Sequence, residues 1–506
     1  MKSFLKKSWP FIFLAVLSFI IHFAFLSYPA QVVFDEVHFG KFVAAYSTGQ
    51  YYFDIHPPLG KLMIAGFVRL TGLNPVFDFE KIGENLPANI LLTLRFLPAF
   101  FGALFVLFFS WLAYLLSRSR QTALIAGFLI LLDNAFLVQS KFILVDIFML
   151  CFEVLTLSFF FLWQQQTKFN AKWFGYLALT GAFAGLTISV KWTGLAVIGI
   201  MGVVLLVKVF SKKLALYLSS SVSHPEHIRS AQYKLREESI KDSSAKLSLA
   251  HAYGLRMTKF ALFKESLLGF FVVLLIAFII YLLPFYLHFK LLPNSGPGDA
   301  FMSQSFQQEL KYGRDNVFQP LNFWQKFTEL NKTMYTANAN LTAEHPFGSK
   351  WYAWPLNSKP VYYWNQDTLD ALPGWQARIY FSGNPVLWWL AGLSLIFVLL
   401  SSTTKNSRRR LSPIFYILLL GYFANLLPFI FVNRVAFLYH YLPTAMYAIL
   451  ILSLLLINFR SKSKTFFWIT IALIIFGFII TAPLSYGWLL PPQFSQLATQ
   501  FIILFN

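Results

Sequence analysis

Residues 9–37 read WPFIFLAVLSFIIHFAFLSYPAQVVFDEV, in which an apolar run over 9–27 is followed by an acidic pair, Asp35-Glu36. An apolar run of about 20 residues is long enough to cross the roughly 30 Å hydrocarbon core of a bilayer as a helix. The run is long for a signal peptide and no A-x-A cleavage site follows it, so we expect a retained first helix. The stretch therefore predicts a membrane protein with carboxylates just beyond the end of its first span.

The overall composition indicates the same class of protein. Of the 506 residues, 57% are hydrophobic and 12% are charged, whereas about a quarter of the residues in soluble domains are charged. A chain with so few charges cannot cover a water-facing surface, so it belongs in a bilayer. Cys151 is the only cysteine, which excludes an intramolecular disulfide and a cysteine-based metal site.

Apolar runs along the chain predict an all-α polytopic protein with about eleven transmembrane helices in one domain, 1–506. The runs lie near 9–27, 94–117, 120–137, 143–163, 173–190, 192–210, 266–288, 384–402, 411–432, 436–458 and 466–482. Basic residues fall in alternate connections, which by the positive-inside rule places the N-terminus in the cytoplasm and the C-terminus outside. Two long connections, 28–92 and 289–383, are then extracytoplasmic, and the most basic one, 211–264, is cytoplasmic.

This topology accounts for the net charge of +20. A nucleic-acid-binding protein would need basic residues interleaved with exposed aromatic residues on one folded face. The basic residues here stand in short connections between apolar runs instead, so nucleic acid is not an expected partner. For the 211–264 loop we derive no role beyond that of a surface for anionic lipid headgroups.

Asp35 and Glu36 are the first candidates for chemistry, because adjacent carboxylates at the end of a span must be hydrated, paired or used in a reaction. Neighbouring helical residues point about 100° apart, so the two carboxylates are not expected to address one reacting atom. One would be a base and the other a structural or acceptor-binding group. The alternative is that Asp35 is a solvated helix N-cap. Asp54 and His56 follow some twenty residues later, from where the loop could return them to the pair.

Both predicted outer loops contain aromatic residues that suggest contact with the membrane interface. Phe39, Phe42, Val43 and Tyr46 fall at helical spacing, which predicts an amphipathic helix lying in the interface. The second loop has an aromatic density typical of a membrane-interface surface. Its aromatic residues include Trp351, Trp354, Tyr362, Tyr363, Trp364 and Trp375.

Five charged residues lie at the predicted outer ends of spans: Arg95, Lys141, Asp146, Lys191 and Arg434. A charge at membrane depth costs about 2.5–3.5 kcal/mol on insertion scales, so it usually faces a cavity or a partner. Any single one could instead extend its charged end to the interface. Four cations on the same side as a carboxylate pair favour an anion site with a base beside it, as a phosphate leaving group would need.

Several motifs of nucleotide and metal chemistry are absent from the chain. It has no D-x-D, P-loop, G-x-G-x-x-G or H-E-x-x-H pattern, so a nucleotide-sugar enzyme with a D-x-D metal site is not supported. His38, His56, His345 and His440 are too scattered to propose a metal set, and we expect them to be hydrogen-bonding partners. Glu153, deep in a predicted span, is expected to be a neutral or paired structural carboxylate.

Blocks of sequence along most of the chain form a specific combined signature. They are FDEVHFGKFVAAYSTGQYYFDIHPPLGKL (34–62), FDFEKIGENLP (77–87), LRFLPAFFGAL (94–104), LLDNAFLVQSKFILVD (131–146), SVKWTGL (189–195), HPFGSKWYAWPL (345–356), KPVYYW (359–364), GNPVLWW (383–389) and NRVAFLYHYLP (433–443). In these collinear blocks the chain resembles the protein O-mannosyltransferases, a family of GT-C membrane glycosyltransferases.

The resemblance implies a GT-C fold with the active site at the outer membrane face. The donor would be a polyprenyl- or dolichyl-phosphate mannose, and the acceptor a Ser or Thr hydroxyl of an exported protein, reacting in a single inverting displacement. By the family's pattern, Asp35 would be the base, Glu36 an essential neighbour, and Arg95 would lie near the lipid phosphate. The donor pocket would be lined by Lys191, Arg434, His440 and Tyr441, with Asp54, His56 and Asp146 in supporting positions.

One departure from the family's pattern concerns the 289–383 loop. Eukaryotic members carry a β-trefoil MIR domain there and this loop is too short for it, so the chain resembles the bacterial or archaeal form, in a cytoplasmic membrane. The reaction requires no nucleotide cofactor, while a divalent metal and the oligomeric state stay open. One rival is a GT-C transferase of another sugar, or to a lipid or cell-wall glycan. The other is a transporter, which would place charges near the bilayer midplane.

Overall fold

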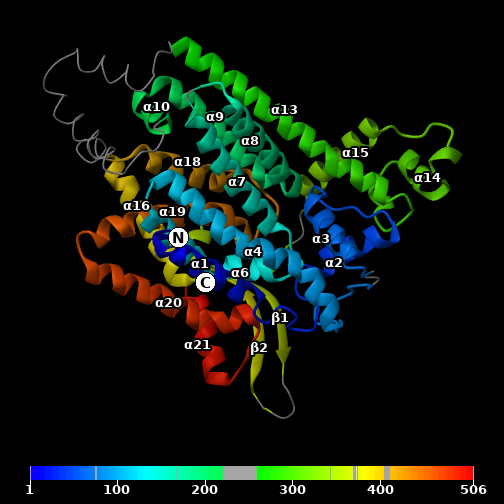
Figure 1. Cartoon of the computed structure of the whole chain (residues 1–506). Coiled ribbons are helices and arrows are strands. Elements are labelled where there is room, and N and C mark those ends of the chain that lie inside the picture. The colour runs from blue at the N-terminus through cyan, green and yellow to red at the C-terminus, as the bar shows by residue number, and fades with distance from the viewer. Residues whose placement is uncertain are drawn as a thin grey trace.

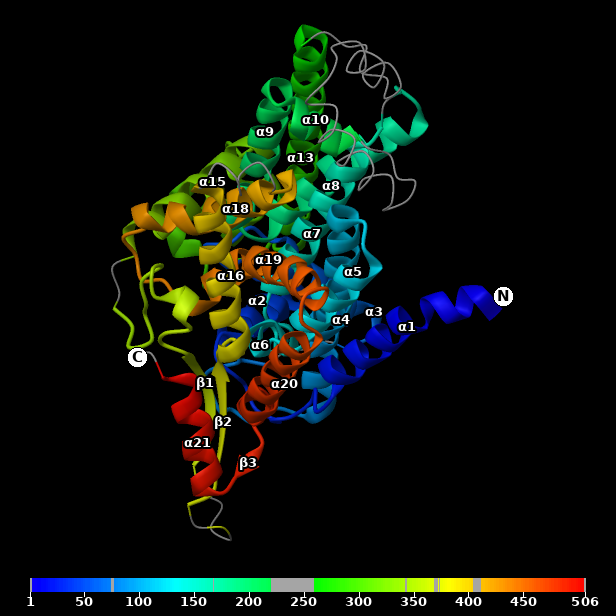
Figure 2. The same cartoon turned by 90° about the vertical axis from the view of Figure 1, so that its left-hand side faces the viewer.

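The computed structural model describes residues 2–73, 77–166, 168–219, 259–341, 344–367, 372, 374–403 and 411–504 (Figure 1). Most of the basic 211–264 loop lies outside the described residues. The helix α10 (Lys212–Ser219) precedes the undescribed part and α13 (Lys259–Leu291) follows it. Long helices make up most of the body (Figures 1 and 2).

Nine helices within the described ranges are long and apolar enough to cross a membrane. They are α4 (Ala88–Ser117), α7 (Asp146–Gln164), α8 (Ala171–Val190), α9 (Leu195–Phe210) with the 3-10 turn η1 (Trp192–Gly194), α13, α16 (Pro385–Thr403), α18 (Pro413–Leu426) with η5 (Leu427–Phe431), α19 (Leu442–Arg460) and α20 (Lys464–Tyr486). The helix α1 (Lys2–Phe23) has a shorter apolar stretch, Ser8–Phe23. Every predicted apolar run lies on a helix, and the count of eleven spans stays a prediction.

The predicted span 120–137 is a broken helix. α5 (Arg120–Leu131) and α6 (Asn134–Lys141) are bent by 63° and together give up to a tenth span. Asp133 produces the break: its Oδ1 accepts hydrogen bonds from the N–H groups of Ala135 (2.9 Å) and Phe136 (3.2 Å). A side chain that satisfies these free N–H groups starts a new helix. The other oxygen accepts a hydrogen bond from Nε1 of Trp388 at 2.6 Å, which joins the break to α16.

The helices α7 and α19 run through the centre of the body. All residues at 146–158 in α7 and at 441–453 at the start of α19 are buried. Helices that are apolar and buried all round are found in the core of a bundle. Asp146 is the first residue of α7 and Leu442 is the first residue of α19. The N-termini of both helices are therefore held in place by the most buried part of the fold.

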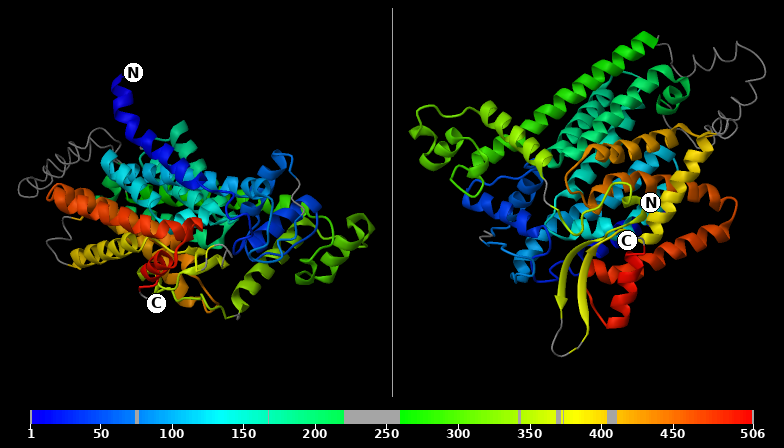
Figure 3. Two further views of the ribbon diagram at one scale, coloured as in Figure 1. Left: turned by 90° about the horizontal axis from the view of Figure 1, so that it is seen from below. Right: turned by 180° about the vertical axis from the view of Figure 1, so that it is seen from behind.

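Shorter elements cover one end of the helical body (Figures 1 and 3). They are α2 (Glu36–Thr48), α3 (Leu59–Leu70), η2 (Asp299–Phe301), α14 (Gln304–Tyr312), η3 (Arg314–Asn316), α15 (Phe323–Asn340), η4 (Trp354–Leu356), β1 (Val361–Asp367), β2 (Gln376–Phe381), η6 (Leu438–Tyr441), β3 (Leu489–Leu490) and α21 (Pro492–Ile502). The strands form an antiparallel sheet in the order β1-β2-β3. The predicted helical fold is confirmed, and this small sheet is an addition that the sequence did not predict.

α2 lies where the apolar spacing predicts a helix, and it ends before Gly49, whose φ of 73° favours glycine. The face formed by Phe39, Val43 and Tyr46 is buried inside the protein, however, and does not face a membrane interface. The reason is that α2 packs on α3 and this face points into the protein core. At its end, the hydroxyl of Tyr46 lies 2.8 Å from Nδ1 of His288 in α13.

Three of the aromatic residues predicted to form a membrane-interface surface in the second loop lie in the protein core instead. Trp354 and Tyr363 are fully buried and Trp364 is 1% exposed. Nε1 of Trp364 donates a hydrogen bond to Oε1 of Gln31 at 2.7 Å. The hairpin β1–β2 therefore folds back over the segment between α1 and α2, a long-range contact that aromatic composition alone does not reveal.

The close packing of α4 can be tested at Gly102. A Cβ there would lie 2.5 Å from Cδ2 of His22 in α1 and 2.5 Å from Cβ of Ser140 in α6. We expect Gly102→Ala to lower the free energy of unfolding by about 1–3 kcal/mol through overpacking, which outweighs its gain in helix propensity of about 1 kcal/mol. The measurement is the melting temperature in detergent. Gly392→Ala is the control, because a Cβ there meets nothing within 4 Å; equal melting of the two variants would contradict the packing.

Candidate active site

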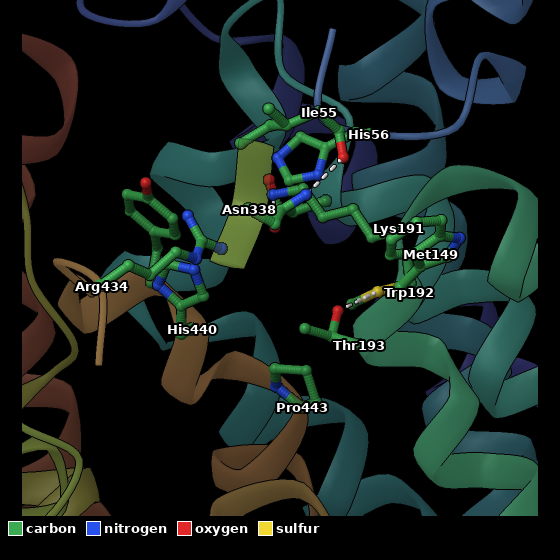
Figure 4. A pocket seen from close by; sticks show the side chains of 12 residues that line it. Ile55, His56, Met149, Lys191, Trp192, Thr193, Asn338, Arg434, His440 and Pro443 are labelled. Atoms are coloured by element: carbon green, nitrogen blue, oxygen red, sulfur yellow. Dashed lines mark hydrogen bonds and ion pairs between the residues drawn. The ribbon is translucent and has the colours of Figure 1, made fainter. Parts of the chain in front are cut away.

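The N-terminal ends of α7 and α19 enclose a pocket with about 490 Å³ of empty space, part of it open to solvent. Its walls come from the first outer loop, α7, the α8–α9 junction, α15 and the segment before α19. The lining residues are Ile55, His56, Asp146, Met149, Lys191, Trp192, Thr193, Asn338, Arg434, Tyr439, His440 and Pro443. In Figure 4, Arg434 and His440 lie across the space from Lys191 and Thr193.

Two basic side chains, Lys191 and Arg434, reach this pocket. Nζ of Lys191 forms an ion pair with Oδ1 of Asp146 at 2.7 Å and lies 5.6 Å from the centre of the Tyr439 ring. Arg434 takes part in none of the ion pairs within the described part of the chain. The positive ends of α7 and α19 add to the potential of these cations. The pocket is therefore suited to an anionic group.

His56 contributes to the pocket without adding a charge. Burial, and then the neighbouring cations, above all Lys191, hold the pKa of its imidazole well below the usual range. The loop that bears it is held from two sides. Nζ of Lys61 is ion-paired with Asp54 and donates to the carbonyl oxygen of His56 at 2.8 Å. Nδ2 of Asn338 in α15 donates to the carbonyl oxygen of Ile55 at 2.9 Å.

Asp35 lies beside the pocket with a free carboxylate. It occupies the N-cap position of α2, but its side chain makes no capping bond, and no described residue donates a hydrogen bond to it. Burial raises the pKa of Asp35 to about 7; Lys191 opposes this shift, and the carboxylates of Asp146 and Asp54 add to it. The loop therefore returns Asp54 to the neighbourhood of the pair, as the sequence suggested. The alternative role of Asp35 as a helix cap is not realised.

Glu36 has the opposite environment, although it is the next residue. It is fully buried, and its carboxylate accepts hydrogen bonds from the N–H groups of Val33 at 2.8 Å and Ile143 at 3.0 Å. Nε and Nη2 of Arg95 complete the set at 2.8 and 2.7 Å. A carboxylate with so many donors is held in one position. Glu36 is therefore a structural group, the second of the two roles that the sequence analysis left open.

The remaining N–H groups of Arg95 bind backbone carbonyls. Nη1 donates to the oxygens of Leu26 at 3.3 Å and Pro29 at 2.9 Å, and Nη2 donates to that of Gln31 at 2.8 Å. All five N–H groups of the guanidinium then have acceptors within the protein, and the side chain is fully buried. The structure thus places Arg95 outside the pocket with no donor left for a lipid phosphate, which differs from the role that the resemblance implied.

A chain of buried side chains connects the segment of Asp35 with Lys191. Phe34 stacks on Tyr363 with ring centroids 4.1 Å apart, and its N–H donates to the Tyr363 carbonyl at 3.1 Å. The hydroxyl of Tyr363 donates to Oε1 of Gln139 at 2.8 Å, and Nε2 of Gln139 donates to Oδ2 of Asp146 at 2.9 Å. Because Asp146 binds Lys191 with its other oxygen, the segment of Asp35 and the Lys191 side chain share one rigid support.

Two further candidates from the sequence lie outside the pocket lining. Tyr441 is buried against Trp388, with ring centroids 4.9 Å apart, and its hydroxyl lies 3.2 Å from that of Tyr422. Tyr439 lines the pocket in its place, because successive residues of the short helix η6 point in different directions. Lys141, in turn, donates to the carbonyl oxygen of Ala24.

Sequence reasoning missed several lining residues, namely Tyr439, Asn338 and Thr193. Asn338 gave no signal, because an amide on a helix of an outer loop resembles any solvent-exposed polar residue. Glu153 is a structural carboxylate, as expected, and accepts a hydrogen bond from the Tyr447 hydroxyl at 2.9 Å. Within the described residues, no group of three or more His, Cys, Asp or Glu side chains is placed to hold a metal ion.

Comparison with known proteins supports the fold and the family. The family described as dolichyl-phosphate-mannose-protein mannosyltransferase matches residues 12–293. The C-terminal four TMM region of protein-O-mannosyltransferase matches residues 323–500. The structure of a protein O-mannosyltransferase Pmt1–Pmt2 complex of Saccharomyces cerevisiae bound to the sugar donor has a TM-score of 0.80 and 19% identity, over 98% of this chain and 92% of that chain. The GT-C fold is thereby confirmed.

Curated relatives align with about 60% of the chain. The dolichyl-phosphate-mannose–protein mannosyltransferase 4 of Candida albicans is 31% identical over 300 residues, which are 58% of this chain and 35% of the relative. The enzyme of the same name from Saccharomyces cerevisiae is 33% identical over 306 residues, 58% of this chain and 34% of the relative. The chain thus spans about a third of the length of these curated relatives.

The saturated guanidinium of Arg95 leads to a test. Arg95→Lys keeps the charge but has fewer donors, so buried acceptors of Glu36 and the backbone lose their partners, and we expect a loss of stability of about 1–3 kcal/mol. Thermal unfolding in detergent measures it. The control is Arg69→Lys in α3, where the side chain is exposed. A melting curve of the Arg95 variant that superimposes on that of the control would show that the five bonds do not stabilise the fold.

Proposed function

The chain belongs to the dolichyl-phosphate-mannose–protein mannosyltransferase family, and from this we propose that it transfers mannose from a polyprenyl-phosphate donor to Ser or Thr hydroxyls of exported proteins. The observation that carries the proposal is the position of Asp35. It has a free carboxylate with a pKa raised to about 7, beside a pocket that presents Lys191 and Arg434. A base is most effective when its pKa lies near the working pH.

In the proposed reaction, the sugar phosphate of the donor occupies the cationic pocket. A serine or threonine oxygen attacks the anomeric carbon as the bond from that carbon to the phosphate oxygen breaks, which inverts the configuration. Asp35 takes the hydroxyl proton in the transition state, because the hydroxyl is too weak an acid to ionise beforehand. The polyprenyl phosphate leaves with the negative charge, which Lys191, Arg434 and the N-termini of α7 and α19 stabilise. Asp35 then returns its proton to solvent.

Other groups in the proposed mechanism bind and orient the reactants. His56 and Asn338 line the pocket as neutral hydrogen-bonding groups, suited to sugar hydroxyls. Arg95 and Glu36 hold the start of α2, so they act on the reaction through the position of Asp35. The sequence of steps uses protein side chains alone and does not depend on a nucleotide or a metal ion.

We also propose that the site faces the outside of a prokaryotic cytoplasmic membrane. The positive-inside distribution of basic residues supports this orientation, and so does the position of Asp146 and Lys191 at helix ends. The segment between α13 and α16 contains α14, α15 and the hairpin, and its length leaves no room for an inserted β-trefoil. Charges at helix ends, away from the midplane, also favour a transferase over a transporter.

Replacement of the base gives the first test. We expect Asp35→Asn to reduce transfer by about 10²–10⁴-fold, because the amide cannot accept the proton. The assay uses purified protein, radiolabelled polyprenyl-phosphate mannose and a Ser/Thr-rich peptide, with the product identified by mass spectrometry. Asp78→Asn, an exposed residue of the same loop, should keep full activity. Full activity of Asp35→Asn would remove the central claim, and label found on lipid or glycan would favour the rival acceptor.

The raised pKa of Asp35 predicts the pH dependence. The carboxyl is protonated and inactive below pH 7 and becomes a base above it, so kcat/KM should rise through a midpoint near pH 7. Since burial disfavours the charged form, Asp35→Asn should melt no lower than the wild type above pH 7, which separates lost chemistry from lost folding. A rate that is flat from pH 5 to pH 9 would exclude Asp35 as the titrating group.

A further inference from the structure

The outer elements α14 and α15 expose aromatic side chains that the proposed function does not use. Phe318, in the segment just before α15, is 97% exposed, and Trp324 in the first turn of α15 is 55% exposed. Figure 1 and the right panel of Figure 3 show α14 and the start of α15 standing out from the helical body beside the end of α13. Large aromatic side chains that are this exposed need a partner that covers them.

The exposed aromatic residues continue the lipid-facing side of α13. Tyr286, 52% exposed near the outer end of that span, has its ring centroid 6.2 Å from that of Phe323, which lies 5.3 Å from that of Trp324. Below Tyr286, α13 exposes a series of apolar residues. These are Phe271, Leu275, Phe278, Ile279 and Leu283. In a membrane span such a series faces acyl chains, and the ring contacts of Phe323 connect it to the first turn of α15.

Cationic side chains accompany this surface. Lys290 in the last turn of α13, Lys311 in α14 and Arg314 in η3 are exposed, with Asp315 as the acidic residue beside them. Aromatic residues together with lysine and arginine at the end of a span are characteristic of the headgroup region of a bilayer. If the partner were a protein, the exposed aromatic residues would not need to adjoin the lipid-facing side of α13. If the partner were water, the phenylalanine side chain that is 97% exposed would be unfavourable.

We propose that Tyr286, Phe318 and Trp324 form a membrane-docking edge that sits in the headgroup region of the outer leaflet. The edge holds α15 at a fixed depth. The other end of the same helix contributes Asn338 to the pocket, where it binds the Ile55 carbonyl. Lipid contact therefore positions one wall of the pocket. This docking goes beyond the proposed function and does not depend on it, because a different reaction in the pocket would leave the edge unchanged.

The test measures depth in a bilayer with single-site spin labels. Cys151 is the only cysteine and is buried, so a label attaches selectively to Phe318→Cys or Trp324→Cys. The control, Lys350→Cys, is exposed in the same outer segment. The full-length protein is placed in nanodiscs of equal parts phosphatidylcholine and phosphatidylglycerol, and collisions with oxygen and with a water-soluble nickel chelate are compared. We expect an oxygen-to-nickel ratio at both edge sites at least about threefold above that of the control.

Two outcomes would overturn the proposal. Equal ratios at the edge sites and the control would place the edge in water. Low collision rates with both reagents would mean that protein, such as a second copy of this chain, covers the edge. If Trp324→Cys does not fold, the test can be made with Phe318→Cys alone. That variant should fold, because a side chain that is 97% exposed contributes little to packing. The collision measurement requires no transfer activity. A failure of the docking proposal can therefore be distinguished from a failure of the proposed function.

Discussion

The buried ion pair between Glu36 and Arg95 is the contact on which the outer half of the molecule depends. Charges taken out of water are stable only when every donor and acceptor has a partner, and removal of one member of such a pair typically costs about 3–5 kcal/mol. Arg95 donates hydrogen bonds to backbone carbonyls in the segment between α1 and α2. Glu36 accepts hydrogen bonds from backbone N–H groups, one of which belongs to Ile143. The pair thereby joins α1, α2, α4 and the α6–α7 connection.

This constraint explains how two adjacent carboxylates take different roles. The bonds of Glu36 fix the first turn of α2, and helix geometry then turns Asp35 about 100° away, beside the pocket. None of the described residues donates a hydrogen bond to Asp35 there, and burial disfavours its charge, so its pKa rises to about 7. Glu36 therefore provides rigidity, and Asp35 has the environment that the proposed proton acceptor requires.

The pocket is assembled from segments that are far apart in the chain, and buried polar contacts align them. Tyr363 of the hairpin, Gln139 of α6, Asp146 of α7 and Lys191 after α8 form one continuous series of bonds. Asn338 joins α15 to the first outer loop from the opposite side. Such a network fixes the orientation of the Lys191 ammonium group, which lines the pocket beside its partner Asp146.

The sequence alone determined the membrane class and the positions of the helices, because apolar length and local spacing are properties of one dimension. It also singled out Asp35-Glu36 as the candidates for chemistry. Tertiary structure decided which side chains face the pocket. Arg95 and Lys141 have the same signature as Lys191, yet both bind backbone carbonyls. Tyr439 takes the place expected for Tyr441. These choices depend on partners far away in sequence, and the direction of a side chain is settled only when those partners pack against it.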